Sequence, residues 1–315
     1  GASGHWWRLR SRLICAEGCA LIATLGGLAP QTPQHISPRK KAKAMNMEDV
    51  AKHGLVLLGC GKMGGAMLKG WLEGGLPASS VYVLDPFPSD WLKSTGVHVN
   101  AGVPEAPAIA LIAVKPQMMG EALPAMQALG NGTTLFVSVA AGTPIAKFED
   151  VLGAQTPIVR AMPNTPAAIG RGISAIVGNG NTTPAHMVLA EALLSAVGQV
   201  VHLENEGQID AVTGVSGSGP AYVFHLIETL AAAGEAQGLP AAMAMQLAKA
   251  TVAGAGALAE AAEEDPSQLR VNVTSPNGTT QAALEVLMDE ANGFPALLGR
   301  AVKAATDRSK ELARG

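Results

Sequence analysis

Cysteine, aromatic side chains and charged side chains are all scarce in this sequence of 315 residues. Aromatic residues make up 3% of it and charged residues 15%. The three cysteines form no CxxC pair and are too few for a disulfide framework, which favours a reducing compartment, the cytoplasm. The seven histidines are scattered without an HExxH motif, so we expect no metal site. The formal net charge of -3 argues against a nucleic-acid partner.

The first 44 residues differ in composition from the rest of the chain. They hold seven basic residues and one acidic residue, a net of +6, so the remainder carries -9. A basic start followed by an apolar run over residues 13–29 resembles a signal peptide, but Glu17 interrupts the run and no small-x-small cleavage site follows. The run is also shorter than the ~20 apolar residues of a membrane span. We therefore expect residues 1–47 to be a disordered upstream extension, with targeting as the alternative.

Residues 55–65 are the stretch around which the remaining chain is organised. An aliphatic run ends in a glycine cluster and a helix-forming segment follows, which predicts a strand, a tight turn and a helix. The glycines have the G-x-G-x-x-G spacing, in which they permit the turn, the approach of a pyrophosphate and close helix packing. Open amides at the helix N-terminus would face the anion. We predict a dinucleotide site here, with a purely structural turn as the alternative. The predicted contacts are Gly59, Gly61, Lys62, Met63 and Gly64.

Strand-like and helix-like runs alternate from Gly54 onward. The predicted strands are residues 55–59, 81–85, 108–114, 134–140, 158–162, 173–177 and 200–203. They are continuously rich in Val, Ile and Leu, which is typical of strands covered on both faces, as in a parallel sheet. The predicted helices between them are residues 64–73, 117–129, 144–152 and 184–197. This alternation predicts a doubly wound α/β domain of the Rossmann type over residues 48–204.

Three polar features follow predicted strands, at the edge where such sheets bind ligands. Asp85 lies about 20 residues beyond the glycine turn, where an acid accepts hydrogen bonds from the adenosine ribose; a turn-starting Asp before Pro86 is the alternative. Lys115 is predicted to contact a ligand, with a solvated charge as the alternative. Residues 160–166 (RAMPNTP) turn through two prolines, which predicts a rigid loop that positions cofactor or substrate.

No strand-like run recurs after Glu204. A long helix is predicted to about Gly238, with Ser218 or Gly219 as its cap and Pro220 in its first turn, and a second over residues 240–264. Both are crowded with Ala and Gly, which indicates burial against a partner subunit. A small-residue turn over 275–280 leads into a helix over 281–289, and a last helix starts at residue 295. We predict an all-α dimerisation domain over residues 205–315.

Taken together, these segments closely resemble the pyrroline-5-carboxylate reductase family. The matching stretches are residues 59–64 (GCGKMG), 114–116 (VKP), 160–166 (RAMPNTP), 216–221 (SGSGPA) and 275–280 (SPNGTT). The last three are specific to the family, and the resemblance covers residues 54–314. Two departures are the first 44 residues, which the family lacks, and Asn277, which replaces the first glycine of a Ser-Pro-Gly-Gly turn. Because Asn tolerates a left-handed backbone, we expect the turn to be kept.

The resemblance implies a Rossmann domain and a helical domain that interlocks with its twin in a homodimer, which often assembles further. It implies NAD(P)H-dependent reduction of the cyclic imine 1-pyrroline-5-carboxylate to L-proline, the last step of proline biosynthesis. Such a reaction needs no nucleophile and no metal, only two bound partners held face to face. NADP(H) or NAD(H) is therefore the expected cofactor.

The same resemblance assigns roles to individual residues. Thr280 matches a threonine that contacts the ring nitrogen, so it is the expected catalytic residue, and amides of the 277–280 turn can hold the carboxylate. Residues 162–164 would lie beside the nicotinamide. The substrate-binding residues implied are Ser218, Ser275, Asn277, Gly278, Thr279 and Thr280. The cofactor-binding residues implied, besides those of the glycine turn, are Asp85, Val114, Lys115, Pro116, Met162, Pro163 and Asn164.

Two other functions remain open at this point. A β-hydroxyacid-dehydrogenase-like oxidoreductase also pairs a Rossmann domain with a helical one, but it requires a catalytic Lys in the long interdomain helix. Lys249 is the only Lys in either long predicted helix, and it lies in the second, away from Ser218. The other alternative is a non-catalytic NAD(P)-binding regulator. Oxidation of NAD(P)H on addition of pyrroline-5-carboxylate distinguishes all three.

Overall fold

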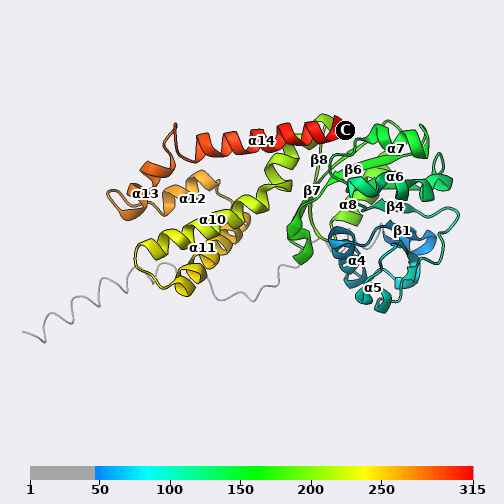
Figure 1. Cartoon of the computed structure of the whole chain (residues 1–315), viewed down its shortest axis with the longest axis horizontal. Helices are drawn as coiled ribbons and strands as arrows, with labels where there is room; N and C mark the ends of the chain where they lie inside the picture. Colours follow the sequence, from blue (N-terminus) through cyan, green and yellow to red (C-terminus); the bar gives the residue numbers. More distant parts are fainter. Residues whose placement is uncertain (1–46, 315) are drawn as a thin grey trace, which may run out of the picture. The chain divides into compact units, whose positions relative to one another are not determined.

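The computed structural model of the protein describes residues 47–314. The extension expected over residues 1–47 lies outside this range except for Met47, which is helical together with the residues up to 53. The described chain begins with a sheet domain and continues into a series of helices (Figure 1). The predicted fold class, a Rossmann domain followed by an all-α domain, is confirmed.

One sheet of eight strands forms the first domain, in the order β3-β2-β1-β4-β5-β6-β7-β8. The strands are β1 (Leu55–Leu58), β2 (Val81–Leu84), β3 (His98–Val99), β4 (Ile109–Ile112), β5 (Leu135–Ser138), β6 (Ile158–Met162), β7 (Gly172–Gly178) and β8 (Gly198–His202). All neighbours pair in parallel except β6 and β7, so the parallel arrangement expected from the sequence ends at β6. The physical reason is the connection over residues 163–171, which is shorter than the dozen or so residues of a parallel crossover.

Helices cover both faces of this sheet (Figure 1). They are α4 (Lys62–Glu73), η1 (Ala78–Ser80), α5 (Asp90–Ser94), η2 (Pro116–Met118), α6 (Met119–Ala122), η3 (Leu123–Leu129), α7 (Ile145–Leu152), η4 (Thr165–Ile169) and α8 (Pro184–Leu194). Side chains of α4, α5 and α8 pack on one face. Those of α6, η3 and α7 pack on the other. This two-sided burial explains why the strands are apolar throughout rather than alternating.

The prediction of one continuous helix over residues 117–129 is wrong. The segment is divided into η2, α6 and η3. Pro124 lies within it, at the second position of η3. Because proline has no N–H and its ring clashes with the preceding turn, a continuous α-helix cannot pass through this residue.

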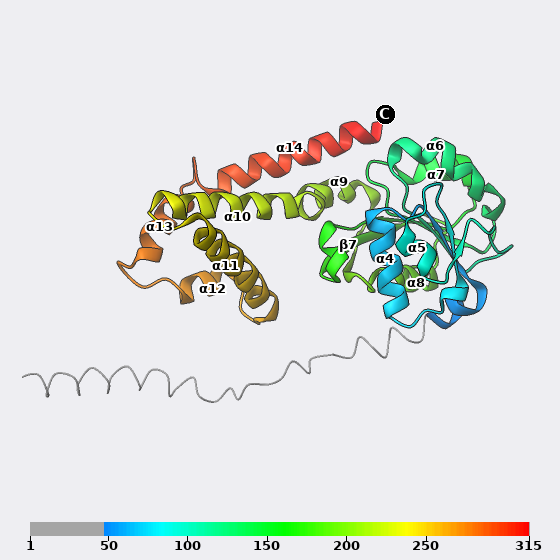
Figure 2. The ribbon, with the colours of Figure 1, turned by 60° about the horizontal axis from the view of Figure 1, so that its bottom comes forward.

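The second part of the described chain is entirely helical. It comprises η5 (Glu206–Gln208), α9 (Ile209–Val212), the π-helical turn η6 (Thr213–Gly217), α10 (Gly219–Ala236), α11 (Ala241–Ala261), α12 (Pro266–Asn272), α13 (Thr279–Leu287) and α14 (Phe294–Arg314). α11 folds back beside α10 (Figure 2). Helix α12 is an addition to the elements predicted from the sequence. Among residues 47–314, no helix combines the length and apolar character needed to cross a membrane.

The α10–α11 pair buries very little of its own apolar surface. Ala231, Ala244 and Ala248 form its only buried cluster in the described structure. Many large apolar residues of this part are instead exposed, among them Val215, Phe224, Leu230, Met243, Leu247, Leu258, Val273, Val286 and Leu297. Exposed apolar surface on this scale marks an interaction surface in a folded protein.

Candidate functional site

The glycine turn has the geometry of a phosphate-binding loop. Gly59 has a φ of 87°, and a Cβ there would lie 2.8 Å from Cγ1 of Val114. A Cβ on Gly64 would collide with the carbonyl oxygen of Gly59, so both glycines are required by the backbone itself. Gly61, in contrast, faces open space: beyond its chain neighbours, no atom lies within 4 Å of the point that a Cβ would occupy. An approach route for a ligand therefore lies over Gly61.

The first turn of α4 completes this loop. Gly61 is its N-cap residue and provides no side-chain hydrogen bond. The amides that open an α-helix have no partner within the helix, so those following Gly61 can receive an anion. Lys62 is exposed and Met63 is half-buried in this same turn. The loop fits the pyrophosphate of a dinucleotide.

Asp85 lies directly against the glycine turn. Its Oδ2 accepts a hydrogen bond from the amide of Cys60 at 2.7 Å, and its Oδ1 accepts one from the amide of Phe87 at 2.8 Å. The bond from Phe87 starts a turn, which is the alternative role considered for Asp85 from the sequence. The bond from Cys60 places the carboxylate beside the glycine turn, so the turn-starting bond does not remove Asp85 from the position predicted for it. Burial, and to a lesser extent the charge of Asp85, raise the pKa of the Cys60 thiol to about 11.

Asn100 holds the end of β2 in place, a role that was not predicted from the sequence. Its side chain donates a hydrogen bond to the carbonyl of Asp85 at 2.8 Å and accepts one from the amide of Asp85 at 3.0 Å. Asn100 itself has a left-handed φ of 52°. An isolated Asn before Ala and Gly carries no sequence signal for this contact, which arises only when β3 pairs with β2.

The other cofactor-binding residues predicted from the sequence follow strands of the same sheet. Val114 and the exposed Lys115 come after β4, which pairs with β1, and Pro116 opens η2. Met162 ends β6, and Pro163 and Asn164 follow it. Asn164 Oδ1 accepts a hydrogen bond from the amide of Ile173 at 2.9 Å, which fixes this loop against β7. Since β1, β2, β4 and β6 run parallel, their carboxyl ends lie along one edge of the sheet.

Ser218 is the N-cap residue of α10, one of the two positions predicted for the helix cap. It precedes α10 in a right-handed helical conformation and makes no side-chain capping bond. The reason is that η6 runs directly into α10, so the chain before Ser218 is already helical. Pro220 does occupy the first turn of α10, as predicted. Ser218 is therefore at one of the two positions predicted for the cap, but its hydroxyl does not cap the helix.

The turn before α13 keeps the conformation expected despite Asn277. This residue has a left-handed φ of 58°, as a glycine there would. The amide of Gly278 donates to the carbonyl of Ser275 at 3.0 Å, and the amide of Asn277 donates to Oε1 of Gln281 at 2.7 Å. Both amides are thus used within the turn.

Two amides of the same turn remain available to a ligand. Thr279 and Thr280 are the first two residues of α13, where amides have no intrahelical partner. Gly278, the N-cap residue, offers no side chain to them. Thr280 is half-buried and Thr279 exposed. Within residues 47–314, no hydrogen bond or ion pair joins this turn to the cofactor-binding residues predicted on the sheet.

Comparison with known proteins covers both parts of the chain. The family model described as pyrroline-5-carboxylate reductase dimerisation matches residues 206–312. The model described as NADP oxidoreductase, coenzyme F420-dependent, matches residues 54–142. The first match spans the helices with exposed apolar surface, and the second spans the glycine turn.

Curated and solved relatives agree with these matches. Pyrroline-5-carboxylate reductase from Pseudomonas aeruginosa is 41% identical over 265 residues, covering 82% of this chain and 96% of that protein. The structure of a pyrroline-5-carboxylate reductase from Coxiella burnetii is 32% identical, with a TM-score of 0.76, covering 83% of this chain and 98% of that one. The Plasmodium falciparum pyrroline carboxylate reductase with NADP bound is 26% identical, with a TM-score of 0.72, covering 84% of this chain and 99% of that one.

Proposed function

The chain belongs to the pyrroline-5-carboxylate reductase family and is an NAD(P)H-dependent oxidoreductase, and we propose that named residues of its two parts hold cofactor and imine face to face. The reaction is the reduction of 1-pyrroline-5-carboxylate to L-proline, the final step of proline biosynthesis. The observation that carries the proposal is that one chain contains both an open glycine turn and a small-residue turn before α13.

The cofactor is proposed to bind along the carboxyl edge of the sheet. The amides after Gly61 would receive the pyrophosphate, and Asp85 would accept hydrogen bonds from the adenosine ribose. The loop after β6 would lie beside the nicotinamide, with its shape fixed by Asn164. When bound, the reduced nicotinamide supplies a hydride to the carbon of the C=N bond.

The substrate is proposed to bind at the turn before α13. Its carboxylate would be received by the amides of Thr279 and Thr280, since those of Asn277 and Gly278 are used within the turn. Ser275 and Asn277 then contribute by shaping the turn, and Ser218 would line the site from its position just before α10. The hydroxyl of Thr280 would hydrogen-bond the ring nitrogen, where charge changes during reduction.

The domain limits are proposed as residues 48–204 for the cofactor domain and 205–315 for the substrate and dimerisation domain. Support comes from β8, which ends at His202, and η5, which begins at Glu206. The protein forms a homo-oligomer through its dimerisation domain. We propose a homodimer that assembles further, because the exposed apolar residues are spread over α10 to α14.

A cytoplasmic location and the absence of a nucleic-acid partner are also proposed. Cys60 is a free thiol, which suits a reducing compartment, and the net charge is -3. Fractionation of cells that express the full chain tests the location, and recovery of activity in a membrane or extracellular fraction would contradict it.

The decisive experiment is oxidation of NAD(P)H, followed at its absorbance maximum, on addition of pyrroline-5-carboxylate to the full chain. Steady turnover with formation of proline is expected. Turnover with a 3-hydroxy acid and NAD(P)⁺ but none with the imine would favour a hydroxyacid dehydrogenase. Cofactor binding without turnover on either substrate would favour a regulator.

A further inference from the structure

Arg160 is a charged residue in the interior of the sheet. It lies in β6 between Val159 and Ala161, and only 5% of it is exposed. Its strand neighbours are Ser138 on β5 and Val177 on β7. Because a buried charge is costly unless it is paired, an arginine at this position needs a specific partner.

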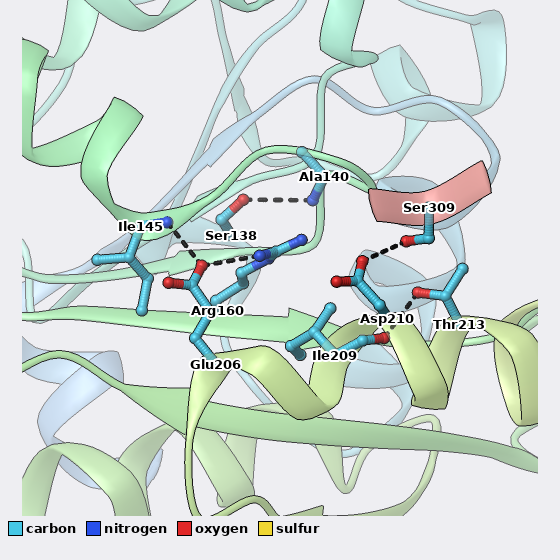
Figure 3. Close-up of polar contacts among 9 residues, drawn as sticks. All are labelled: Ser138, Ala140, Ile145, Arg160, Glu206, Ile209, Asp210, Thr213 and Ser309. Carbon is cyan, nitrogen blue, oxygen red and sulfur yellow. Dashed lines mark hydrogen bonds and ion pairs between the residues drawn. The ribbon is translucent and has the colours of Figure 1, made fainter. Parts of the chain in front are cut away.

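That partner is Glu206. Nη1 of Arg160 lies 2.7 Å from Oε1 of Glu206, and the same oxygen accepts a hydrogen bond from the amide of Ile145 at 2.8 Å (Figure 3). Glu206 is the first residue of η5, where the helical part of the chain begins after β8. Ile145 is the first residue of α7. One carboxylate oxygen therefore joins the sheet, a helix of the cofactor domain and the start of the second domain.

A second polar contact holds the residues that follow. Oδ1 of Asp210, in α9, accepts a hydrogen bond at 2.7 Å from the hydroxyl of Ser309, a buried residue of α14 (Figure 3). Ile209, beside it, is buried in the same apolar cluster as α7. Further along, a Cβ on Gly214 would lie 2.9 Å from the carbonyl oxygen of Val302, so η6 also packs closely on α14. The segment that begins at Glu206 is thus also held against α14, at Asp210 and Gly214.

The far end of this segment touches the loop proposed to lie beside the nicotinamide. A Cβ on Gly217 would lie 2.6 Å from Cε of Met162. Met162 is two residues after Arg160 in β6, so both side chains leave the same face of the strand. Strand β6 therefore contacts the segment 206–217 at both ends. Arg160 contacts its first residue, and Met162 contacts its last residue, after which Ser218 and α10 follow.

We propose that Arg160 and Glu206 are positioning residues that set the loop at 162–164 against the helical segment 216–220, which holds Ser218, and so align cofactor and imine. This inference rests on the proposed function, because it assigns the loop to the nicotinamide and Ser218 to the substrate. Neither residue takes part in the chemistry. They act through Met162 and Gly217, and a small displacement between two bound reactants lowers the rate strongly.

The test separates alignment from stability. Glu206→Ala is expected to lower kcat by roughly 10- to 100-fold, with cofactor Kd and the KM for the imine nearly unchanged. It should also lower the melting temperature, because it leaves the Arg160 charge buried and unpaired. The double variant Arg160→Met/Glu206→Leu replaces the pair with apolar side chains, so it should recover most of the melting temperature while kcat stays low.

A matched control is Glu260→Ala. Glu260, in α11, pairs with Arg171 at 2.7 Å and also joins the two parts of the chain, but both side chains of this pair are about half exposed. Its loss should change kcat by less than about twofold. If the double variant regains kcat together with melting temperature, the Arg160–Glu206 pair only stabilises the fold and the inference is overturned. A wild type without turnover on the imine would overturn the proposed function and this inference with it.

Discussion

The hydroxyl of Thr280 is the side-chain group expected to act at the ring nitrogen. A hydrogen bond to a group that gains or loses charge contributes ~1.5–3 kcal/mol. Thr280→Ala should therefore lower kcat/KM for the imine by roughly 10- to 100-fold, while cofactor Kd stays the same because the nicotinamide is proposed to bind to the other domain. Thr280→Val, which keeps the shape, should behave like the Ala variant, and Thr280→Ser should keep most activity. Full activity in the Val variant would mean that the residue only packs and that backbone amides bind the substrate unaided.

Asp85 is expected to shift cofactor preference toward NADH. Its carboxylate would repel the 2′-phosphate of NADPH by about 1–3 kcal/mol after screening. Asp85→Ser should raise the ratio of kcat/KM for NADPH to that for NADH by about tenfold or more. The carboxylate also accepts hydrogen bonds from the amides of Cys60 and Phe87. Asp85→Asn is therefore the better-matched variant, because it removes the charge and keeps an acceptor oxygen. If both cofactors lose affinity equally in the two variants, Asp85 only supports the turn.

Cys60 is expected to be an unreactive thiol despite its place in the turn. Only the thiolate reacts with alkylating agents, and with a pKa of about 11 the thiol keeps its proton at neutral pH. At pH 8 its thiolate fraction is roughly 100-fold smaller than that of a thiol with the usual pKa. Alkylation by iodoacetamide, followed by mass spectrometry in a Cys15→Ser/Cys19→Ser background, should be correspondingly slow and should accelerate above pH 9. Rapid alkylation at pH 7 would contradict the raised pKa of this half-buried thiol.

At the scale of whole elements, the turn before α13 depends on the left-handed backbone of Asn277. Glycine adopts this conformation freely, whereas a β-branched residue does so at a cost of roughly 1–2 kcal/mol. Asn277→Gly should keep activity and stability, and Asn277→Val should lower kcat/KM because it moves the amides of Thr279 and Thr280. Urea denaturation and steady-state kinetics measure the two effects. Wild-type kinetics in the Val variant would show that this turn does not hold the substrate.

The sequence predicts elements well where local patterns decide them. The predicted limits of β6 match the observed ones, and those of β1 agree to within one residue, because buried apolar runs and glycine turns are local signals. The antiparallel pairing of β7 is not predictable in this way, since strand direction depends on the length and path of a connection. The two-residue strand β3 is too short for any periodicity, and a single residue, Pro124, divides a segment whose apolar pattern is otherwise helical.

The candidate site was predictable only in its local parts. The glycine turn and the turn before α13 are contiguous in sequence, so composition alone points to them. Asn100, Glu206 and Asp210 act over separations of 15, 46 and 99 residues along the chain. Their partners become neighbours only after the sheet and helices have packed. A single sequence gives no signal for such contacts.

The whole molecule is expected to be an obligate oligomer, because the α10–α11 pair buries only three alanines in a cluster of its own. A Cβ on Gly254 in α11 would meet no atom of another element within 4 Å, and Ala232 in α10 is exposed. A large charged side chain therefore fits at either position within one subunit, but it would be buried and unpaired against a partner.

Gly254→Arg and Ala232→Glu should each lower the mass of the particle and the activity together, with little change in the secondary structure of the subunit. Light scattering coupled to size-exclusion chromatography measures the mass, and circular dichroism measures the helix content. Gly180→Arg is the matched control, because Gly180 also faces open space but lies in the sheet domain, before α8. It should leave both mass and activity unchanged. A fully active monomer of either α10 or α11 variant would rule out obligate assembly through these helices, and the exposed apolar residues would then need another explanation.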